Sequence, residues 1–165
     1  MTQEDVIKVL DLKPLPQEGG YYRETFRSSQ TVEPAAIGGA VGQRNLGTAI
    51  FYFLTPDQFS ALHRLKYAEI FHFYLGDPVE MTQIDASGKL QIVTLGQDIL
   101  SGQQVQAVVA PDTWQGTKLK TGGKWALLGT TMAPGFDFAD FELADANHLS
   151  TRYPAHSPAI RGLCR

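Results

Sequence analysis

With 165 residues, 43% of them hydrophobic, the chain has the length of one domain with a substantial core, so we expect a single domain over residues 1–165. The formal net charge of −3 argues against nucleic-acid binding, and the longest apolar run, residues 49–54, is too short to span a membrane. The chain has a single cysteine, Cys164, which argues against a disulfide framework and a thiolate zinc site. Because Glu4 and Asp5 replace the basic and then apolar pattern of a signal peptide, we expect a cytoplasmic protein.

Residues 2–11 are predicted to form a short helix, since Thr2 and Asp5 have the spacing of a capping box and apolar residues follow at helical spacing. After this helix, short segments rich in β-branched and aromatic residues recur between turn signals. These predicted strands cover residues 21–28, 47–55, 59–66, 69–75, 79–85, 90–95, 106–110 and 125–132. The crossover helices of a parallel sheet are missing, so the pattern predicts an antiparallel sandwich or barrel.

Three connecting segments complete the predicted order. Residues 29–46 are rich in glycine and poorly periodic, which predicts a long loop. Residues 85–88 have the composition of a hairpin turn. After Phe136, acids alternate with Phe and Leu, and we expect a loop able to close the mouth of a barrel, a helix around 144–150 and a short terminal turn.

The densest group of chemically active side chains begins at His63. Two strands joined by a tight turn would bring His63 close to Glu69. Strand alternation places Glu69, Phe71 and Phe73 on one face and His72 on the other. A buried glutamate needs a partner, a metal or a substrate group, so His63 and Glu69 are the leading catalytic candidates. The alternative is a hydrogen-bonded pair that only fixes the turn.

This spacing resembles the first motif of the cupin superfamily, H-x-H-x(3,4)-E-x(6)-G. His63, Glu69 and Gly76 take matching positions, and Leu65 replaces the second histidine. The second cupin motif, P-x-G-x-x-H, falls near residues 109–116, where Gln115 takes the histidine position. Two of the four ligands that the family uses for a metal are therefore missing by type.

A longer resemblance covers nearly the whole chain. The segments EGGYYRETFRS, FSALHRLKYAEIFHFYLGDPVE and APGFDFADFELA are similar to a cupin branch called cupin-5, a domain of unknown function. The resemblance implies an all-β double-stranded β-helix, or cupin jelly-roll barrel, that pairs as a homodimer. We expect this barrel to carry a short N-terminal helix and short C-terminal helical segments. The resemblance implies no established activity.

The leading hypothesis is a metal-free isomerase or epimerase acting on a polar small molecule, sugar-like or nucleotide-like. His63 would be the base, held by Glu69, and Tyr52 the acid, with Tyr22 and Tyr74 as alternatives. The side chains expected to bind substrate are Arg23, Phe71, Phe73, Trp114 and Gln115, and Arg64 is a second candidate for holding an anion.

Two other hypotheses remain open. A metal-dependent dioxygenase or isomerase would bind divalent Fe, Mn or Zn through His63, Glu69 and Gln115, with His72 joining only if a bulge reverses its face. A non-enzymatic module would bind a small ligand on an aromatic inner face. The aromatic residues expected on that face are Phe51, Phe53, Phe71, Phe73, Trp114 and Trp125.

Overall fold

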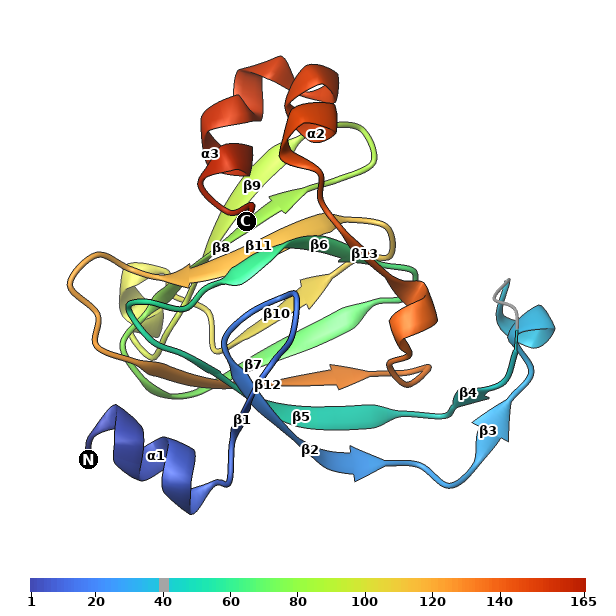
Figure 1. The fold of residues 1–165 in the computed structure, drawn as a ribbon, viewed down its shortest axis with the longest axis horizontal. Helices are drawn as coiled ribbons and strands as arrows, with labels where there is room; N and C mark the ends of the chain where they lie inside the picture. Colours follow the sequence, from blue (N-terminus) through green and yellow to red (C-terminus); the bar gives the residue numbers. More distant parts are fainter. Residues whose placement is uncertain (39–41) are drawn as a thin grey trace.

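Two antiparallel sheets pack face to face in the computed structural model, which describes residues 1–38 and 42–165 (Figure 1). The six-stranded sheet contains, in order, β1 (Lys13–Pro14), β2 (Tyr21–Arg27), β5 (Thr48–Leu54), β12 (Ala126–Met132), β7 (Glu69–Gly76) and β10 (Gln106–Val109). The five-stranded sheet contains β13 (Phe141–Leu143), β6 (Ser60–Leu65), β11 (Trp114–Leu119), β8 (Val79–Ile84) and β9 (Leu90–Leu95). This arrangement confirms the predicted all-β fold.

Short helices lie at both ends of the chain. The helix α1 (Gln3–Val9) begins at the predicted capping box, in which Thr2 Oγ1 accepts from Asp5 N and Asp5 Oδ2 accepts from Thr2 N. The C-terminal helices are α2 (Ala146–Arg152), η4 (Pro154–His156) and α3 (Ser157–Arg161). Among the described residues, no helix is long and apolar enough to cross a membrane.

The predicted strands are confirmed, and the structure adds elements that the sequence pattern did not show. The segment 29–46 contains the ribbon of β3 (Thr31–Val32) and β4 (Arg44–Asn45), with η1 (Pro34–Ile37) between them; its residues 39–41 lie outside the described residues. The turn η2 (Ile99–Ser101) precedes β10. The strand β11 was missed because Gly116 interrupts its apolar pattern, yet a Cβ there would lie 3.1 Å from the Ser60 carbonyl oxygen, so glycine fits closely.

The apolar core fills one end of the space between the sheets. Along β5, Tyr52 and Leu54 point into this core, whereas Thr48 and Ile50, on the same face, border a cavity. The strand β12 repeats the pattern, with Leu128 in the core and Thr130 at the cavity. The core residues are Tyr52, Leu54, Phe71, Phe73, Val79, Met81, Val93, Leu95, Ala107, Val109, Ala126 and Leu128. The position of an inward-facing residue along its strand therefore decides whether it joins the core or borders the cavity.

The helices cover the outer faces of the two sheets, meaning the faces turned away from the other sheet. The helix α1 packs Val6 against Phe53 and Leu127 of the six-stranded sheet. The C-terminal helices pack Leu149 and Ile160 against the five-stranded sheet. With both outer faces partly covered, apolar side chains on those faces are buried without lining the space between the sheets.

Candidate functional site

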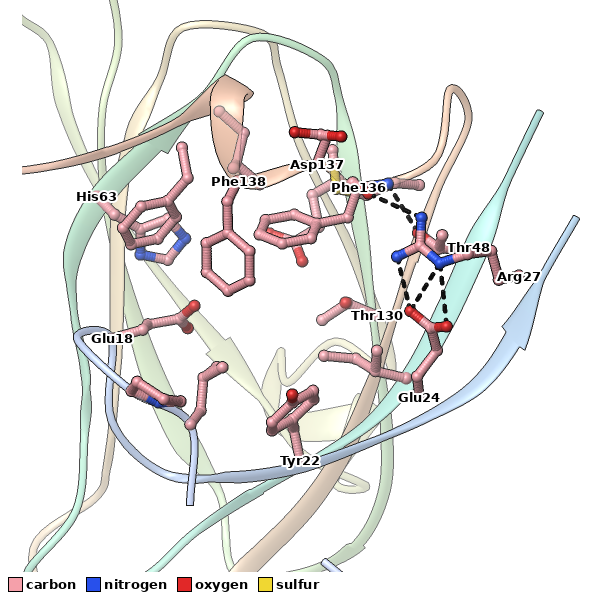
Figure 2. Close-up of a pocket in the computed structure, with 17 residues that line it drawn as sticks. Glu18, Tyr22, Glu24, Arg27, Thr48, His63, Thr130, Phe136, Asp137 and Phe138 are labelled. Atoms are coloured by element: carbon pink, nitrogen blue, oxygen red, sulfur yellow. Dashed lines mark hydrogen bonds and ion pairs between the residues drawn. The ribbon is translucent and has the colours of Figure 1, made fainter. Parts of the chain in front are cut away.

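A cavity of about 490 Å³ lies between the sheets at the end that the core leaves unfilled (Figure 2). Its walls come from β2, β5, β6, β7 and β12, and from segments 15–18 and 136–141. This volume suits a small organic ligand. The polar residues that line it are Glu18, Tyr22, Glu24, Arg27, Thr48, His63, Glu69, Thr130 and Asp137.

His63, from β6, is 2% exposed, and its ring points into the cavity (Figure 2). Its Nδ1 lies 2.8 Å from the carbonyl oxygen of Ala61, which only accepts hydrogen bonds. The neutral ring therefore carries its proton on Nδ1 and presents Nε2 as an acceptor. The ring also stacks on Phe141 at a centroid distance of 5.1 Å, which fixes its plane.

Glu69, at the start of β7, is 8% exposed and lines the same cavity, as the alternation of β7 predicted. Its Oε2 accepts a 2.7 Å hydrogen bond from Gln115 Nε2. Burial raises the pKa of the Glu69 carboxyl, the charge of Glu18 raises it further, and His63 and Thr130 act in the opposite direction. The predicted proximity of His63 and Glu69 is thus present, with Glu18 as an additional carboxyl.

Tyr52 does not line the cavity, and its hydroxyl is bound to the backbone. Tyr52 is 1% exposed, and its hydroxyl donates a 2.9 Å hydrogen bond to the Gly19 carbonyl oxygen. Burial raises the pKa of this phenol well above its ordinary value, with the charge of Glu18 as a further cause. Tyr22, directly opposite Tyr52 in the register of β2 and β5, lines the cavity instead.

Glu24 reaches the cavity wall by alternation from Tyr22, and a bulge in β2 brings Arg27 to the same wall. The register shifts between Glu24 and Phe26, so Arg27 faces the same side as Tyr22 and Glu24. Arg27 contacts both carboxylate oxygens of Glu24 at 2.7–3.2 Å and donates to the Phe136 carbonyl oxygen at 3.1 Å (Figure 2). Arg27 could not be predicted because simple alternation does not reveal a bulge, whereas Glu24 was missed because Arg23, on the opposite face of β2, was expected to enter the cavity.

The arginines expected to hold a substrate lie on outer faces. Arg23 lies over the ring of Phe51, 5.3 Å from its centroid. Arg64 pairs with Glu142 and lies 4.8 Å from the centroid of a Trp114 ring. Strand alternation produces both placements, because their neighbours Tyr22, Glu24 and His63 point inward.

The expected aromatic lining is also corrected by the structure. Phe71 and Phe73 face inward as predicted, but they lie within the core beside the cavity. Trp114 packs in the cluster beneath the C-terminal helices. Phe53, with Phe51 and Trp125 packed beside it, lies in the cluster beneath α1, on the outer face. The aromatic side chains that line the cavity are Tyr22, Phe136, Phe138 and Phe141.

The residues considered for a metal do not form a suitable donor set. Leu65 occupies the position of a histidine ligand and lines the cavity with apolar atoms. Gln115 directs its amide nitrogen at Glu69, and His72, on the opposite face of β7, lies 3.1 Å from Thr131 Oγ1. Within residues 1–38 and 42–165, no group of three or more His, Cys, Asp or Glu could hold a metal ion.

Comparison with solved structures defines the fold as a cupin barrel. A crystal structure of a Shewanella oneidensis protein has a TM-score of 0.89 and 31% identity, covering 100% of this chain and 98% of that one. A hypothetical protein from Leishmania major has a TM-score of 0.90 and 30% identity, covering 99% of both chains. Bacillus subtilis oxalate decarboxylase, at 17% identity and a TM-score of 0.55, shares the fold alone, over 93% of this chain and 37% of its own.

Sequence comparison defines the family within this fold. The family model described as Cupin superfamily (DUF985) matches residues 4–144, so the chain belongs to this family. An uncharacterized protein of Saccharomyces cerevisiae is 29% identical over 133 residues, which are 75% of this chain and 66% of the yeast protein. This chain therefore spans slightly less than two thirds of that relative. Family membership fixes the fold, and the reaction has to be derived from the site.

Proposed function

We propose that the cavity binds a polar, sugar-like small molecule and that His63 moves a proton on it, as in an isomerase or epimerase. The observation that supports this most is the fixed tautomer of His63, whose Nε2 is presented to a ligand-sized cavity. Glu69 and Glu18 lie nearby, and their negative charge would stabilise the imidazolium that forms.

The proposed step begins at a carbon next to a carbonyl group of the ligand. His63 Nε2 takes the proton, the C–H bond breaks, and its electron pair moves to the carbonyl oxygen to give an enolate. Tyr22, which lies across the cavity from His63, returns a proton to the opposite face of that carbon (Figure 2). Both side chains then exchange protons with water, so the step balances without a further reactant. Tyr22 replaces Tyr52 here because the Tyr52 hydroxyl donates to a backbone carbonyl.

Deuterium exchange tests this proposal. A panel of aldoses and ketoses would be incubated with the protein in D₂O, and deuterium incorporated into carbon would be measured by NMR. The wild type is expected to catalyse exchange, and His63→Gln to slow it by about 10²-fold or more. His72→Gln is the matched control, because His72 lies on the opposite face of β7 and should leave exchange unchanged. Exchange that persists in His63→Gln would contradict the proposal.

A non-enzymatic binding module is the second candidate. It is favoured by the apolar part of the wall, which includes Leu15, Ile50, Leu65 and Met132. This function requires saturable ligand binding by the wild type with no deuterium incorporated into any bound compound, so the same experiment separates the two candidates.

A further inference from the structure

The hydrogen-bonding groups at the inner end of the cavity are mainly acceptors. In its neutral form His63 offers Nε2 as an acceptor, because Nδ1 is the donor to the Ala61 carbonyl oxygen. A carboxylate accepts hydrogen bonds and donates none, so the side chains of Glu18 and Glu69 are acceptors in their ionised forms. Protein donors already reach both carboxylates: Ser60 Oγ lies 2.7 Å from Glu18, Gln115 Nε2 lies 2.7 Å from Glu69, and the Thr130 hydroxyl also hydrogen-bonds to Glu69. A ligand that satisfies the remaining acceptors has to bring donors of its own.

The charge of the cavity wall is also one-sided. Four carboxyl groups line it, those of Glu18, Glu24, Glu69 and Asp137, against the single guanidinium of Arg27. That guanidinium is already occupied, because Nε and Nη2 contact Glu24, and Nη1 donates to Asn45 Oδ1 at 2.7 Å and to the Phe136 carbonyl oxygen at 3.1 Å. Arg27 therefore joins β2 to the segment over the cavity mouth, and its hydrogen bonds go to none of the other three carboxyl groups, which would repel an anionic ligand.

Aromatic rings surround the mouth of this acidic cavity. Phe136 and Phe138 meet edge to face at 5.0 Å, and Phe138 and Phe141 at 6.3 Å. Phe138 is 58% exposed although it lines the cavity, so its ring is available to an entering ligand (Figure 2). The face of an aromatic ring attracts a cation, and the attraction strengthens as water is removed.

From these three features we infer that the ligand of this cavity is a small cation rich in hydrogen-bond donors, namely a protonated amine that also carries hydroxyl groups. The inference rests on the proposed function and adds the charge class of its ligand. An acidic cluster alone would not identify a ligand site. Here His63, 2% exposed, independently directs Nε2, the ring nitrogen that does not contact Ala61, into the same space. Burial and Glu18 both raise the pKa of Glu69, and a cation beside these carboxyls would favour their ionised forms.

Matched probes test the charge of the ligand. Isothermal titration calorimetry would compare two triplets, glucosamine with glucose and glucuronate, and ethanolamine with ethylene glycol and glycolate, at pH 6.5. Within each triplet the amine is expected to bind at least about tenfold more tightly than the neutral compound, with the acid weakest. Tightest binding by a neutral or acidic member would overturn the inference, as would a lack of binding by all six. The proposed proton transfer is judged separately, by deuterium exchange.

A pair of glutamine variants tests whether the amine binds in this cavity. Glu18→Gln keeps the shape of the side chain and its acceptor for Ser60 but removes one charge, so the affinity for the better-binding amine should fall at least about tenfold. Glu142→Gln removes the charge of an exposed carboxylate that pairs with Arg64 outside this cavity, and it should leave the affinity unchanged. Circular dichroism would confirm that both variants fold. Equal affinities in the two variants would contradict the assignment of the amine to the cavity.

Discussion

The carboxyl group of Glu69 is subject to opposing influences whose net effect is a raised pKa. Burial and Glu18 raise the pKa above 4.5, and His63, Thr130 and Gln115 lower it. Because the folded protein disfavours ionisation of this group, the stability associated with Glu69 is fully present below about pH 4.5, the ordinary value. That stability is lost as the pH rises through the raised pKa of the folded state.

Replacing Glu69 with glutamine tests this sign. The variant Glu69→Gln carries no group to ionise, so its free energy of unfolding relative to wild type should increase as the pH rises above 4.5. Urea unfolding of both proteins between pH 3 and pH 8 measures the difference. Asp85→Asn provides a control of opposite sign, because hydrogen bonds from Ser87 and Lys89 lower the pKa of Asp85. The disadvantage of Asp85→Asn should shrink as the pH falls. A free energy of unfolding of Glu69→Gln that falls relative to wild type as the pH rises would contradict the assignment.

The strands show how far sequence alone leads. Alternation along β7 correctly placed Glu69, Phe71 and Phe73 on the inner face, because each residue of a regular strand reverses the direction of its side chain. Two features of the strands could not be predicted from the sequence. The bulge in β2 reverses the alternation before Arg27, and it has no signature in residue type. The strand β11 was not recognised, and its alternation places Gln115 inward and Trp114 on the outer face, where the C-terminal helices bury it.

The sequence also did not show which end of each strand contributes to the core and which to the cavity. Tyr52 points inward as alternation requires, but alternation does not tell which end of the barrel is filled by core and which holds the cavity. That choice depends on apolar partners from β8 and β9, such as Met81 and Val93, which pack against the end of β5 that carries Tyr52. The pair of His63 and Glu69 was found because its two residues are close in sequence, whereas Glu18 joins them from a distant segment.

The short elements β4 and η3 (Phe138–Asp140) are joined by a buried ion pair. Arg44 Nε lies 2.6 Å from Asp140 Oδ2, and Nη2 lies 3.0 Å from Oδ1, with side-chain exposures of 5% and 4%. This two-point contact links the ribbon of β3 and β4 to the segment that carries Phe138 at the cavity mouth. Removing one partner leaves a buried charge, which costs more than the pair itself contributes.

We therefore expect Asp140→Ala to lower the free energy of unfolding by about 3–5 kcal/mol. The double variant Arg44→Met with Asp140→Leu should recover a large part of that loss, because it leaves no buried charge behind. The control is Glu142→Ala, which breaks the exposed pair with Arg64 and should cost less than about 1 kcal/mol. Urea unfolding of the four proteins gives the comparison. Equal losses in Asp140→Ala and Glu142→Ala would show that the buried pair behaves like a surface pair.

At the scale of the whole molecule, the same strands build the core at one end and the cavity at the other. The core end consists of apolar side chains from both sheets, and the outer faces are covered by α1 and by the C-terminal helices. The cavity end carries His63, Glu69 and Gln115, which are buried polar groups and contribute little apolar burial. Stability and ligand binding should consequently respond to different substitutions.

Alanine substitution at each end tests this separation. Leu128→Ala removes a fully buried core side chain and should cost about 2–5 kcal/mol, because it leaves a closed void between the sheets. His63→Ala removes one hydrogen bond and enlarges a cavity that already exists, so its cost should be about 1 kcal/mol. Urea unfolding followed by the fluorescence of Trp114 and Trp125 measures both. A loss in His63→Ala as large as that in Leu128→Ala would mean that the histidine serves to hold the turn between β6 and β7, and the proposed base would have to be sought elsewhere in the cavity.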